Sequence, residues 1–346
     1  MRIAIVRLSS LGDVIIATSV LNALKGHQIE WFVDERFEGV IKDSPFIHTI
    51  HSLPFKKLLK SPVGILQIRK YCKRCGAFDA VVDMQGLMKS ALIGSFIDSK
   101  QFVGFDWKGS REGIASLFYS QKIAMAYDEN ILKRNFALFA PLGVKIDSLD
   151  SDVRVCNIGF DADSVQADVK TKICQPIKYR ILLVLEASIS QKEYPIDKFA
   201  TLAHLFYNKL QDFCVFVVWN ANETRADTFC QKLENLHIPY QKMPKLDLNA
   251  LKFCVAHMDC VIGGDTGVTH LAWAMGRECI TLYGNTSSTC GKNMSATKLE
   301  RVLLGNPYIV SQSEEFEIAS IKESDIFELF MNDIFPRLAL NAHKKI

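Results

Sequence analysis

The chain has 346 residues, of which 49% are hydrophobic and 23% charged, and its formal net charge is +3. This length favours about two domains, and the composition excludes a disordered chain. No uncharged apolar run reaches about 18 residues, so no transmembrane helix is expected. The strand-like residues 3–6 follow Met1-Arg2 without the pattern of a signal peptide, which predicts a cytoplasmic protein. The net charge is too small to indicate nucleic-acid binding by the whole chain.

The first half of the chain alternates between strand-like and helix-like segments. Strands are expected over 3–7, 30–33, 77–83 and 101–105, and helices over 12–24 and 89–96. This alternation predicts a parallel sheet with helices on both faces. Polar residues then replace the pattern from about 157 to 178, which indicates a linker.

The alternation restarts after this linker. Strands are expected over 179–185, 213–219, 259–262 and 279–284, and helices over 199–210, 224–233 and 314–340. The simplest arrangement is an α/β protein with two Rossmann-like domains, residues 1–165 and 178–322. In such a protein the ligand lies between the domains, at the carboxyl ends of the strands.

The most informative motif is the turn Gly-Gly-Asp-Thr-Gly at 263–267, which follows a buried strand and opens a helix. Unpaired backbone N–H groups and the positive end of a helix dipole make such a helix start an anion site. Asp265 and Thr266 suit the N-cap, and Gly267 allows close approach of a ligand. The motif predicts a phosphorylated or nucleotide-linked ligand. His270, in the first turn of the helix, fits a structural and a functional role equally well.

Three further polar segments follow predicted strands. Residues 9–13, Ser-Ser-Leu-Gly-Asp, match neither the Walker nor the dinucleotide fingerprint. Their Asp13 is either a favourable charge in a first helical turn or a general base. Lys192, in the polar segment 188–195, is either a solvated residue or a positive charge for a phosphate. Residues 219–223 carry polar groups that suit ribose hydroxyls.

Cationic residues crowd one stretch of the chain without an acidic residue between them: Lys56, Lys57, Lys60, Arg69, Lys70, Lys73 and Arg74. Apolar residues interleave with these charges, a mixture that suits an anionic membrane surface or an anionic amphiphile. A solvated basic surface is an equally consistent interpretation. The ten cysteines are scattered, and the Cys72–Cys75 spacing lacks a second pair, so reduced thiols and no zinc site are expected.

Together and in this order, the motifs resemble the bacterial lipopolysaccharide heptosyltransferases, in particular the heptosyltransferase I branch. The matching segments span nearly the whole chain: 9–13, 83–91, 104–107, 110–112, Lys192 with Pro195, 265–267 with His270, 283–284 with Thr286, and 291–293. The resemblance implies a GT-B fold, in which two Rossmann-like domains present parallel sheets to a central cleft. It also implies that residues 323–346 form a helix returning to the N-terminal domain.

The same resemblance implies an activity and its partners. An enzyme of this family transfers L-glycero-D-manno-heptose from ADP-heptose, with inversion, to a Kdo residue of Kdo-lipid A. It needs no metal ion or other cofactor, binds no nucleic acid, and works in the cytoplasm at the face of the inner membrane. A transferase for a later core sugar, a transferase for another nucleotide sugar, and a non-catalytic nucleotide-binding module are alternatives. The missing GxGxxG argues against a dehydrogenase.

The resemblance carries roles onto matching residues. Asp13 is implied as the catalytic base and Lys192 as the catalytic contact to the donor phosphates. The other implied donor contacts are Ser188, Asn222 or Glu223 at the ribose, Leu246 near the adenine, Asp265 toward the heptose, Thr266 and Gly267 at the diphosphate, and His270. The acceptor contacts are expected from Ser10, Gly12, Lys57, Lys60, Gln85 and Arg111.

Overall fold

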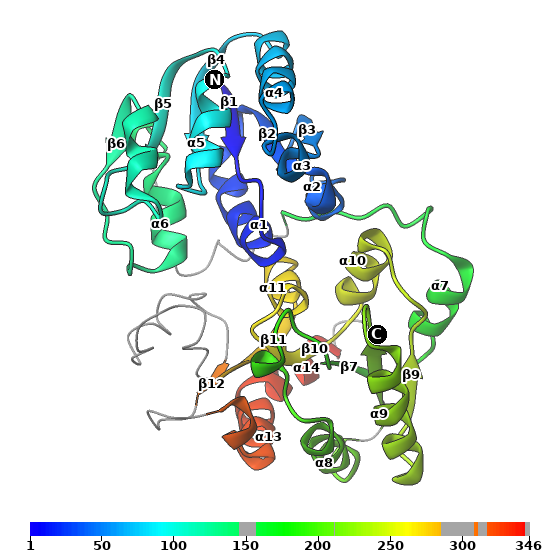
Figure 1. The fold of residues 1–346 in the computed structure, drawn as a ribbon. Helices are drawn as coiled ribbons and strands as arrows, with labels where there is room; N and C mark the ends of the chain where they lie inside the picture. Colours follow the sequence, from blue (N-terminus) through cyan, green and yellow to red (C-terminus); the bar gives the residue numbers. More distant parts are fainter. Residues whose placement is uncertain (145–156, 211, 285–307, 311–316, 343–346) are drawn as a thin grey trace. The chain divides into compact units, whose positions relative to one another are not determined.

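The computed structural model describes residues 1–144, 157–210, 212–284, 308–310 and 317–342. These residues form two compact units, which divide between Gly159 and Phe160. Each unit contains a six-stranded sheet (Figure 1), and every strand pair in both sheets is parallel among the described residues. The predicted α/β class with two parallel sheets is confirmed.

The sheet of the first unit has the strand order β3-β2-β1-β4-β5-β6. Its strands are β1 (Arg2–Val6), β2 (Gln28–Asp34), β3 (Thr49–Leu53), β4 (Phe78–Asp83), β5 (Ser99–Phe105) and β6 (Gln121–Ile123). Its α-helices are α1 (Leu11–Ala17), α2 (Glu38–Ile41), α3 (Phe55–Leu58), α4 (Pro62–Arg74), α5 (Met88–Ser95) and α6 (Ile131–Ala137). The strand order reverses at β1: β2 and β3 follow on one side of it, and β4, β5 and β6 on the other. Loops after β1 and β4 therefore lie beside each other, at the point where parallel α/β sheets bind ligands.

The sheet of the second unit has the order β12-β11-β10-β7-β8-β9. Its strands are β7 (Tyr179–Val184), β8 (Phe213–Val218), β9 (Tyr240–Lys242), β10 (Cys260–Gly264), β11 (Glu278–Tyr283) and β12 (Tyr308–Val310). Its α-helices are α7 (Ala167–Ile173), α8 (Ile196–Tyr207), α9 (Glu223–Asn235), α10 (Leu248–Ala256), α11 (Gly267–Ala274), α13 (Glu323–Leu329) and α14 (Phe335–Ala342). The equivalent reversal falls at β7, so the loops after β7 and β10 are neighbours.

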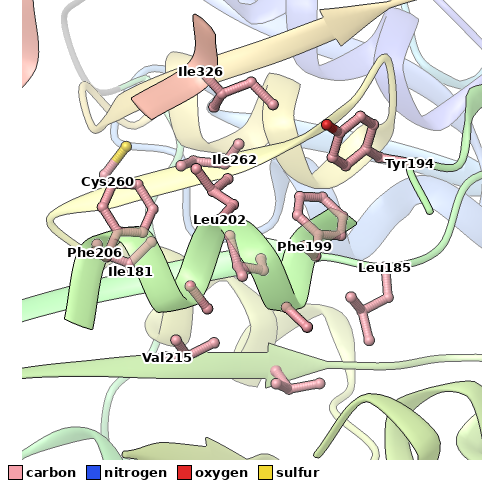
Figure 2. Packing of buried hydrophobic residues seen from close by; sticks show 14 of the residues in the cluster. Ile181, Leu185, Tyr194, Phe199, Leu202, Phe206, Val215, Cys260, Ile262 and Ile326 are labelled. Carbon is pink, nitrogen blue, oxygen red and sulfur yellow. The ribbon is translucent and has the colours of Figure 1, made fainter. Parts of the chain in front are cut away.

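Apolar residues at the centre of each sheet explain why these segments form strands. Residues 3–6 of β1 have no exposed surface, as expected for a strand covered on both faces. In the second unit, α8 packs Phe199, Leu202 and Phe206 against the sheet, as Figure 2 shows. The alternation of buried strands and amphipathic helices is therefore what positions the strand-end loops.

The described part of the C-terminal segment, 323–342, packs within the second unit. The return of residues 323–346 to the N-terminal domain stays a prediction. Ile326, Phe330 and Ile334 are fully buried in the core of the second unit, and the ring centroids of Phe330 and Phe206 lie 4.8 Å apart. The four-residue spacing of these side chains makes one apolar stripe, and α8 offers the surface that covers it.

Three local features differ from the predicted elements. The expected helix 12–24 is α1 followed by a 3-10 helix at Thr18–Leu24. The segment predicted as a linker contains α7, which buries Val169 and Ile173. The basic stretch contains the unpredicted helix α4, because Ile68 and Cys72, four residues apart, are buried on one side of it. No helix among the described residues is both long and apolar enough to cross a membrane.

Candidate active site

The first candidate site lies where the loops after β1 and β4 meet. The backbone N–H of Leu8 donates to Oε1 of Gln85 at 2.8 Å, and the Arg7 guanidinium donates to the Met84 carbonyl. Two loops that are 77 residues apart in the sequence are thereby joined. This edge of the sheet carries the proposed base, Asp13, in the first turn of α1.

The two oxygens of the Asp13 carboxylate contact different groups. Oδ1 pairs with the Arg7 guanidinium at 2.9 Å. Oδ2 accepts hydrogen bonds from the Ser10 backbone N–H at 3.1 Å and from the Ser10 hydroxyl at 2.9 Å. The Asp13 side chain is 38% exposed and that of Arg7 is 10% exposed. A carboxylate that is oriented by its partners yet reachable from solvent suits a general base.

The buried carboxylate of Asp83 holds the loop after β4 in place. Its carboxylate accepts hydrogen bonds from the backbone N–H groups of Gln85 and Gly86 at 2.8 and 3.2 Å. The hydroxyls of Ser90 and Tyr119 also donate to it, each at 2.8 Å. Burial raises the pKa of Asp83, although these hydrogen bonds oppose the rise. Gln85, expected to contact the acceptor, is itself 9% exposed and held by this network.

The expected acceptor contacts all lie at the carboxyl edge of the first sheet. Ser10 and Gly12 lie at the start of α1, and Arg111 is exposed in the segment that follows β5. Lys57 and Lys60 line a cavity of about 190 Å³; its other lining residues are Asp34, Glu35, Arg36, Pro54 and Lys56. Four of these seven side chains are cationic, so the cavity suits an anionic group.

The second candidate site is built from the loops after β7 and β10. Lys192, in a 3-10 helix at Ser190–Lys192, pairs with Oδ2 of Asp265. Nε2 of His270, in the first turn of α11, lies 2.9 Å from Oδ1 of the same carboxylate. A Cβ atom on Gly264 would lie 1.9 Å from the Lys192 carbonyl oxygen, so only glycine lets the two loops approach this closely.

The charge of this cluster follows from its contacts. Burial tends to raise the pKa of Asp265, but the hydrogen bond and charge of His270 and the charge of Lys192 hold it well below its usual range. The carboxylate is therefore ionised near neutral pH. Its side chain is 25% exposed and that of Lys192 is 23% exposed, so a ligand can reach both.

The N-terminus of α11 completes this site. Thr266 is the N-cap of this eight-residue helix, and its backbone N–H donates to Oγ1 of Thr269 at 3.2 Å. The hydroxyl oxygen of Thr266 is buried and has no hydrogen-bond partner among the described residues. Gly267 follows as the first helical residue. An ammonium, a helix N-terminus and an unpartnered hydroxyl within one loop cluster suit an anionic ligand.

The residues expected at the ribose already have partners in the second unit. Oδ1 of Asn222 caps α9 by accepting from the Arg225 backbone N–H at 2.9 Å. Glu223 pairs with Lys242 at 2.8 Å. Glu186, which was not predicted, accepts from the backbone N–H groups of 220, 221 and 222 at 3.0, 2.9 and 3.2 Å. In the sequence, the one feature that could have pointed to Glu186 is its position as a carboxylate shortly after the strand β7. Which residue contacts the ribose stays a prediction.

Two other expected donor contacts lie on loops at the same edge. Ser188 is exposed in the loop after β7, and Leu246 is partly buried between β9 and α10. Residues Thr286 and 291–293, which carry part of the resemblance, lie outside the described residues, as do Cys156 and Cys290. Within the described ranges, no three His, Cys, Asp or Glu side chains are grouped so that they could hold a metal ion.

Comparison with known proteins matches both units. Residues 66–314 match the model of glycosyltransferase family 9 (heptosyltransferase). Lipopolysaccharide heptosyltransferase 1 of Campylobacter coli is 32% identical over 350 residues, which cover 95% of this chain and 98% of that protein. The Escherichia coli K12 protein of the same name is 27% identical, with 88% and 96% covered.

Solved structures share the fold. The structure of E. coli heptosyltransferase WaaC with ADP-2-deoxy-2-fluoro heptose has a TM-score of 0.72 at 23% identity, and the match covers 96% of this chain and all of that one. E. coli ADP-heptose lps heptosyltransferase II has a TM-score of 0.68 at 15% identity, with 99% and 100% covered. With the family model and the Campylobacter relative, these matches establish that the chain belongs to glycosyltransferase family 9, the heptosyltransferases.

Proposed function

We propose that this glycosyltransferase moves L-glycero-D-manno-heptose from ADP-heptose to a Kdo residue of Kdo-lipid A, in the assembly of the lipopolysaccharide inner core. The observation that carries the proposal is the cluster of Lys192, Asp265 and the α11 N-terminus, at the strand-order reversal of the second sheet. The donor is supported by the name of a structural neighbour, which contains a fluorinated ADP-heptose. The acceptor is supported by the names of the relatives.

The second unit supplies the chemistry of the leaving group. As the sugar leaves, negative charge grows on the departing diphosphate. The Lys192 ammonium and the N–H groups at the start of α11 stabilise this charge, and the Thr266 hydroxyl donates one more hydrogen bond. Removing one such preorganised donor typically costs about 2.7–4 kcal/mol of transition-state stabilisation. We propose that these groups act without a metal ion or other cofactor.

The first unit supplies the chemistry of the acceptor. Asp13 takes the proton from the acceptor hydroxyl as that hydroxyl attacks the anomeric carbon. A single displacement forms the new glycosidic bond while the bond to ADP breaks, so the anomeric configuration inverts and no enzyme nucleophile is needed.

The charges of the first unit fit an acidic acceptor. Kdo carries a carboxylate and lipid A carries phosphates, and Lys57 and Lys60 line a cavity in which cations predominate. Exposed apolar side chains, Val63 and Leu66, lie on α4 among exposed basic residues. We propose that this surface also holds the enzyme at the cytoplasmic face of the inner membrane, since mixed basic and apolar surfaces bind anionic lipids.

The test is turnover of the purified protein with ADP-heptose and Kdo-lipid A. Asp13→Asn is expected to lose activity while still binding ADP. Asp98→Asn is the matched control, because Asp98 also pairs with a cation in the first unit but is 56% exposed and lies directly before β5. Turnover that requires an acceptor already bearing heptose would identify a later step, and turnover with another nucleotide sugar would replace the donor. ADP binding without any transfer would leave only a nucleotide-binding module.

A further inference from the structure

Arg7 has contacts that the proposed roles of the site do not use. It follows β1 directly, and its backbone is fixed by the neighbouring strand: its N–H donates to the Phe32 carbonyl at 3.2 Å, and its carbonyl accepts from Nε1 of Trp31 at 3.3 Å. Its guanidinium contacts both the Met84 carbonyl and Oδ1 of Asp13. One side chain thus links the end of β1, the end of β4 and the proposed base.

Burial makes this ion pair stronger than a surface pair. Only 10% of the Arg7 side chain is exposed, and its Nε is buried without a partner among the described residues. Removing a guanidinium from water is costly unless it is paired, and the Asp13 carboxylate is the charge that pairs it. The planar fork of arginine also fixes direction, because separate nitrogens contact Met84 and Asp13.

Arg7 and Ser10 contact different oxygens of the Asp13 carboxylate. Arg7 holds Oδ1, whereas the donors on Oδ2 are the backbone and the hydroxyl of Ser10. A backbone N–H is fixed, but a hydroxyl rotates. An incoming acceptor hydroxyl can therefore take the place of the Ser10 hydroxyl on Oδ2 without disturbing the Arg7 pair.

We propose that Arg7 is a positioning residue for the transfer reaction: it fixes Asp13 with Oδ2 directed to the acceptor and keeps the carboxylate ionised. This inference rests on the proposed function, since it assumes that Asp13 is the base. Other charged groups on the helices packed against α1 are Glu38 on α2 and Lys133 and Arg134 on α6. Lys133 pairs with Glu129, Arg134 donates to the carbonyls of 109 and 126, and Arg7 pairs directly with Asp13.

The test compares Arg7→Gln, Arg7→Lys and a matched control, Arg2→Gln. Arg2 lies on the same strand and pairs with the buried carboxylate of Glu30 at 2.7 Å, away from Asp13. Loss of precise placement typically costs about 100-fold in rate, so Arg7→Gln is expected to lower kcat by about 10- to 100-fold. Loss of the neighbouring charge is expected to move the acid limb of the pH–rate profile up by about one pH unit.

Arg7→Lys keeps the charge but cannot contact both Met84 and Asp13, so it should keep the acid limb and lower kcat less than Arg7→Gln. Arg2→Gln should lower the melting temperature but leave the acid limb unchanged. The inference is overturned if Arg7→Gln has the wild-type profile, or if Arg2→Gln moves the acid limb equally. Should Arg7→Gln not fold, wild-type kcat in Arg7→Lys overturns it.

The experiments distinguish a failure of the proposed function from a failure of the role proposed for Arg7. If the wild-type protein transfers no heptose, or if Asp13→Asn is as active as the wild type, the assigned reaction or base is wrong. If Asp13→Asn is inactive and Arg7→Gln behaves as the wild type, only the role of Arg7 is wrong.

Discussion

Lys192 and Asp265 form an ion pair between loops that are 73 residues apart in the sequence but leave neighbouring strands of one sheet. The second oxygen of Asp265 stays with His270. A diphosphate that binds Lys192 must therefore share its ammonium with Asp265 or displace that carboxylate. If Lys192 contacts the leaving diphosphate as we propose, the ion pair already holds its ammonium in place, so less reorganisation is needed during the reaction.

Replacement of Lys192 tests this arrangement. Lys192→Ala is expected to lower kcat/KM for the donor by about 100- to 1,000-fold, because a charge that stabilises the leaving group is removed. Lys198→Ala is the control, since Lys198 also lies in the second unit and pairs with Glu323 at 3.7 Å. It should change stability without this loss of activity. Steady-state kinetics with varied ADP-heptose measures kcat/KM for both variants. An equal decrease of kcat/KM in the two would contradict the role of Lys192 at the leaving group.

Asp265 makes a prediction about stability and pH. Because its pKa is lowered in the folded protein, the ionised carboxylate stabilises the fold above the ordinary pKa of an aspartate, about 3.9. That contribution is lost as the pH falls below this value toward the folded-state pKa. The difference in free energy of unfolding between the wild type and Asp265→Asn should therefore be constant near neutral pH and shrink below about pH 4. Urea unfolding at several pH values measures it; a difference that grows on acidification would contradict the sign.

Much of this arrangement follows from local sequence patterns. The strand before 263–267 and the helix after it were predictable, because buried apolar runs and Gly-rich turns have local signatures. The parallel alternation also placed Lys192 and Asp265 at strand ends, at the same edge of a sheet. Neither residue carries a signal that names the other as its partner, since that contact depends on the strand order.

Other features depend on contacts that no local pattern contains. Arg7 resembles any charged residue at the end of a strand, and its pairing with Asp13 appears only in the folded unit. The position of Asn222 after a strand predicts a ribose contact, and that local pattern does not show that its side chain also caps α9. The C-terminal stripe was visible as a helix, but its spacing does not say which of two apolar cores it covers.

Asp83 provides a test of how the acceptor edge is supported. Asp83→Ala would leave the N–H groups of Gln85 and Gly86 buried without an acceptor, at about 1–3 kcal/mol for each lost partner. Asp83→Asn keeps an acceptor oxygen, and the Ser90 and Tyr119 hydroxyls can rotate to suit its amide. We expect the alanine variant to be clearly less stable than the asparagine variant by thermal unfolding. Equal stability of the two would show that this network does not hold the loop.

Metal dependence is a separate prediction. If Lys192 and the α11 N-terminus neutralise the leaving diphosphate, dialysis against EDTA should leave kcat unchanged, and added Mg²⁺ should not raise it. The assay is heptose transfer by chelated protein with substrates freed of metal ions. Activity that disappears with EDTA and returns with a divalent cation would contradict the proposed chemistry.

The basic surface makes the final prediction. A Lys57→Gln/Lys60→Gln double variant is expected to bind anionic vesicles more weakly by roughly 2 kcal/mol, because a basic residue near such a surface contributes about 1 kcal/mol. The matched control is Lys25→Gln/Lys100→Gln, which removes the same charge: Lys25 precedes β2 and Lys100 lies near the start of β5, at the opposite edge of the sheet. Co-sedimentation with vesicles of phosphatidylglycerol and phosphatidylethanolamine, at two salt concentrations, measures the effect.

The acceptor KM of the same variants separates two roles for the cavity. If Lys57 and Lys60 contact the acidic acceptor, their replacement also raises the KM for a soluble, delipidated Kdo acceptor that retains its phosphates. If they contact only the membrane, that KM stays at the wild-type value while vesicle binding falls. Equal vesicle binding by the two double variants, with no change in KM, would remove this surface from both roles, because net charge alone would then account for the attraction to lipid.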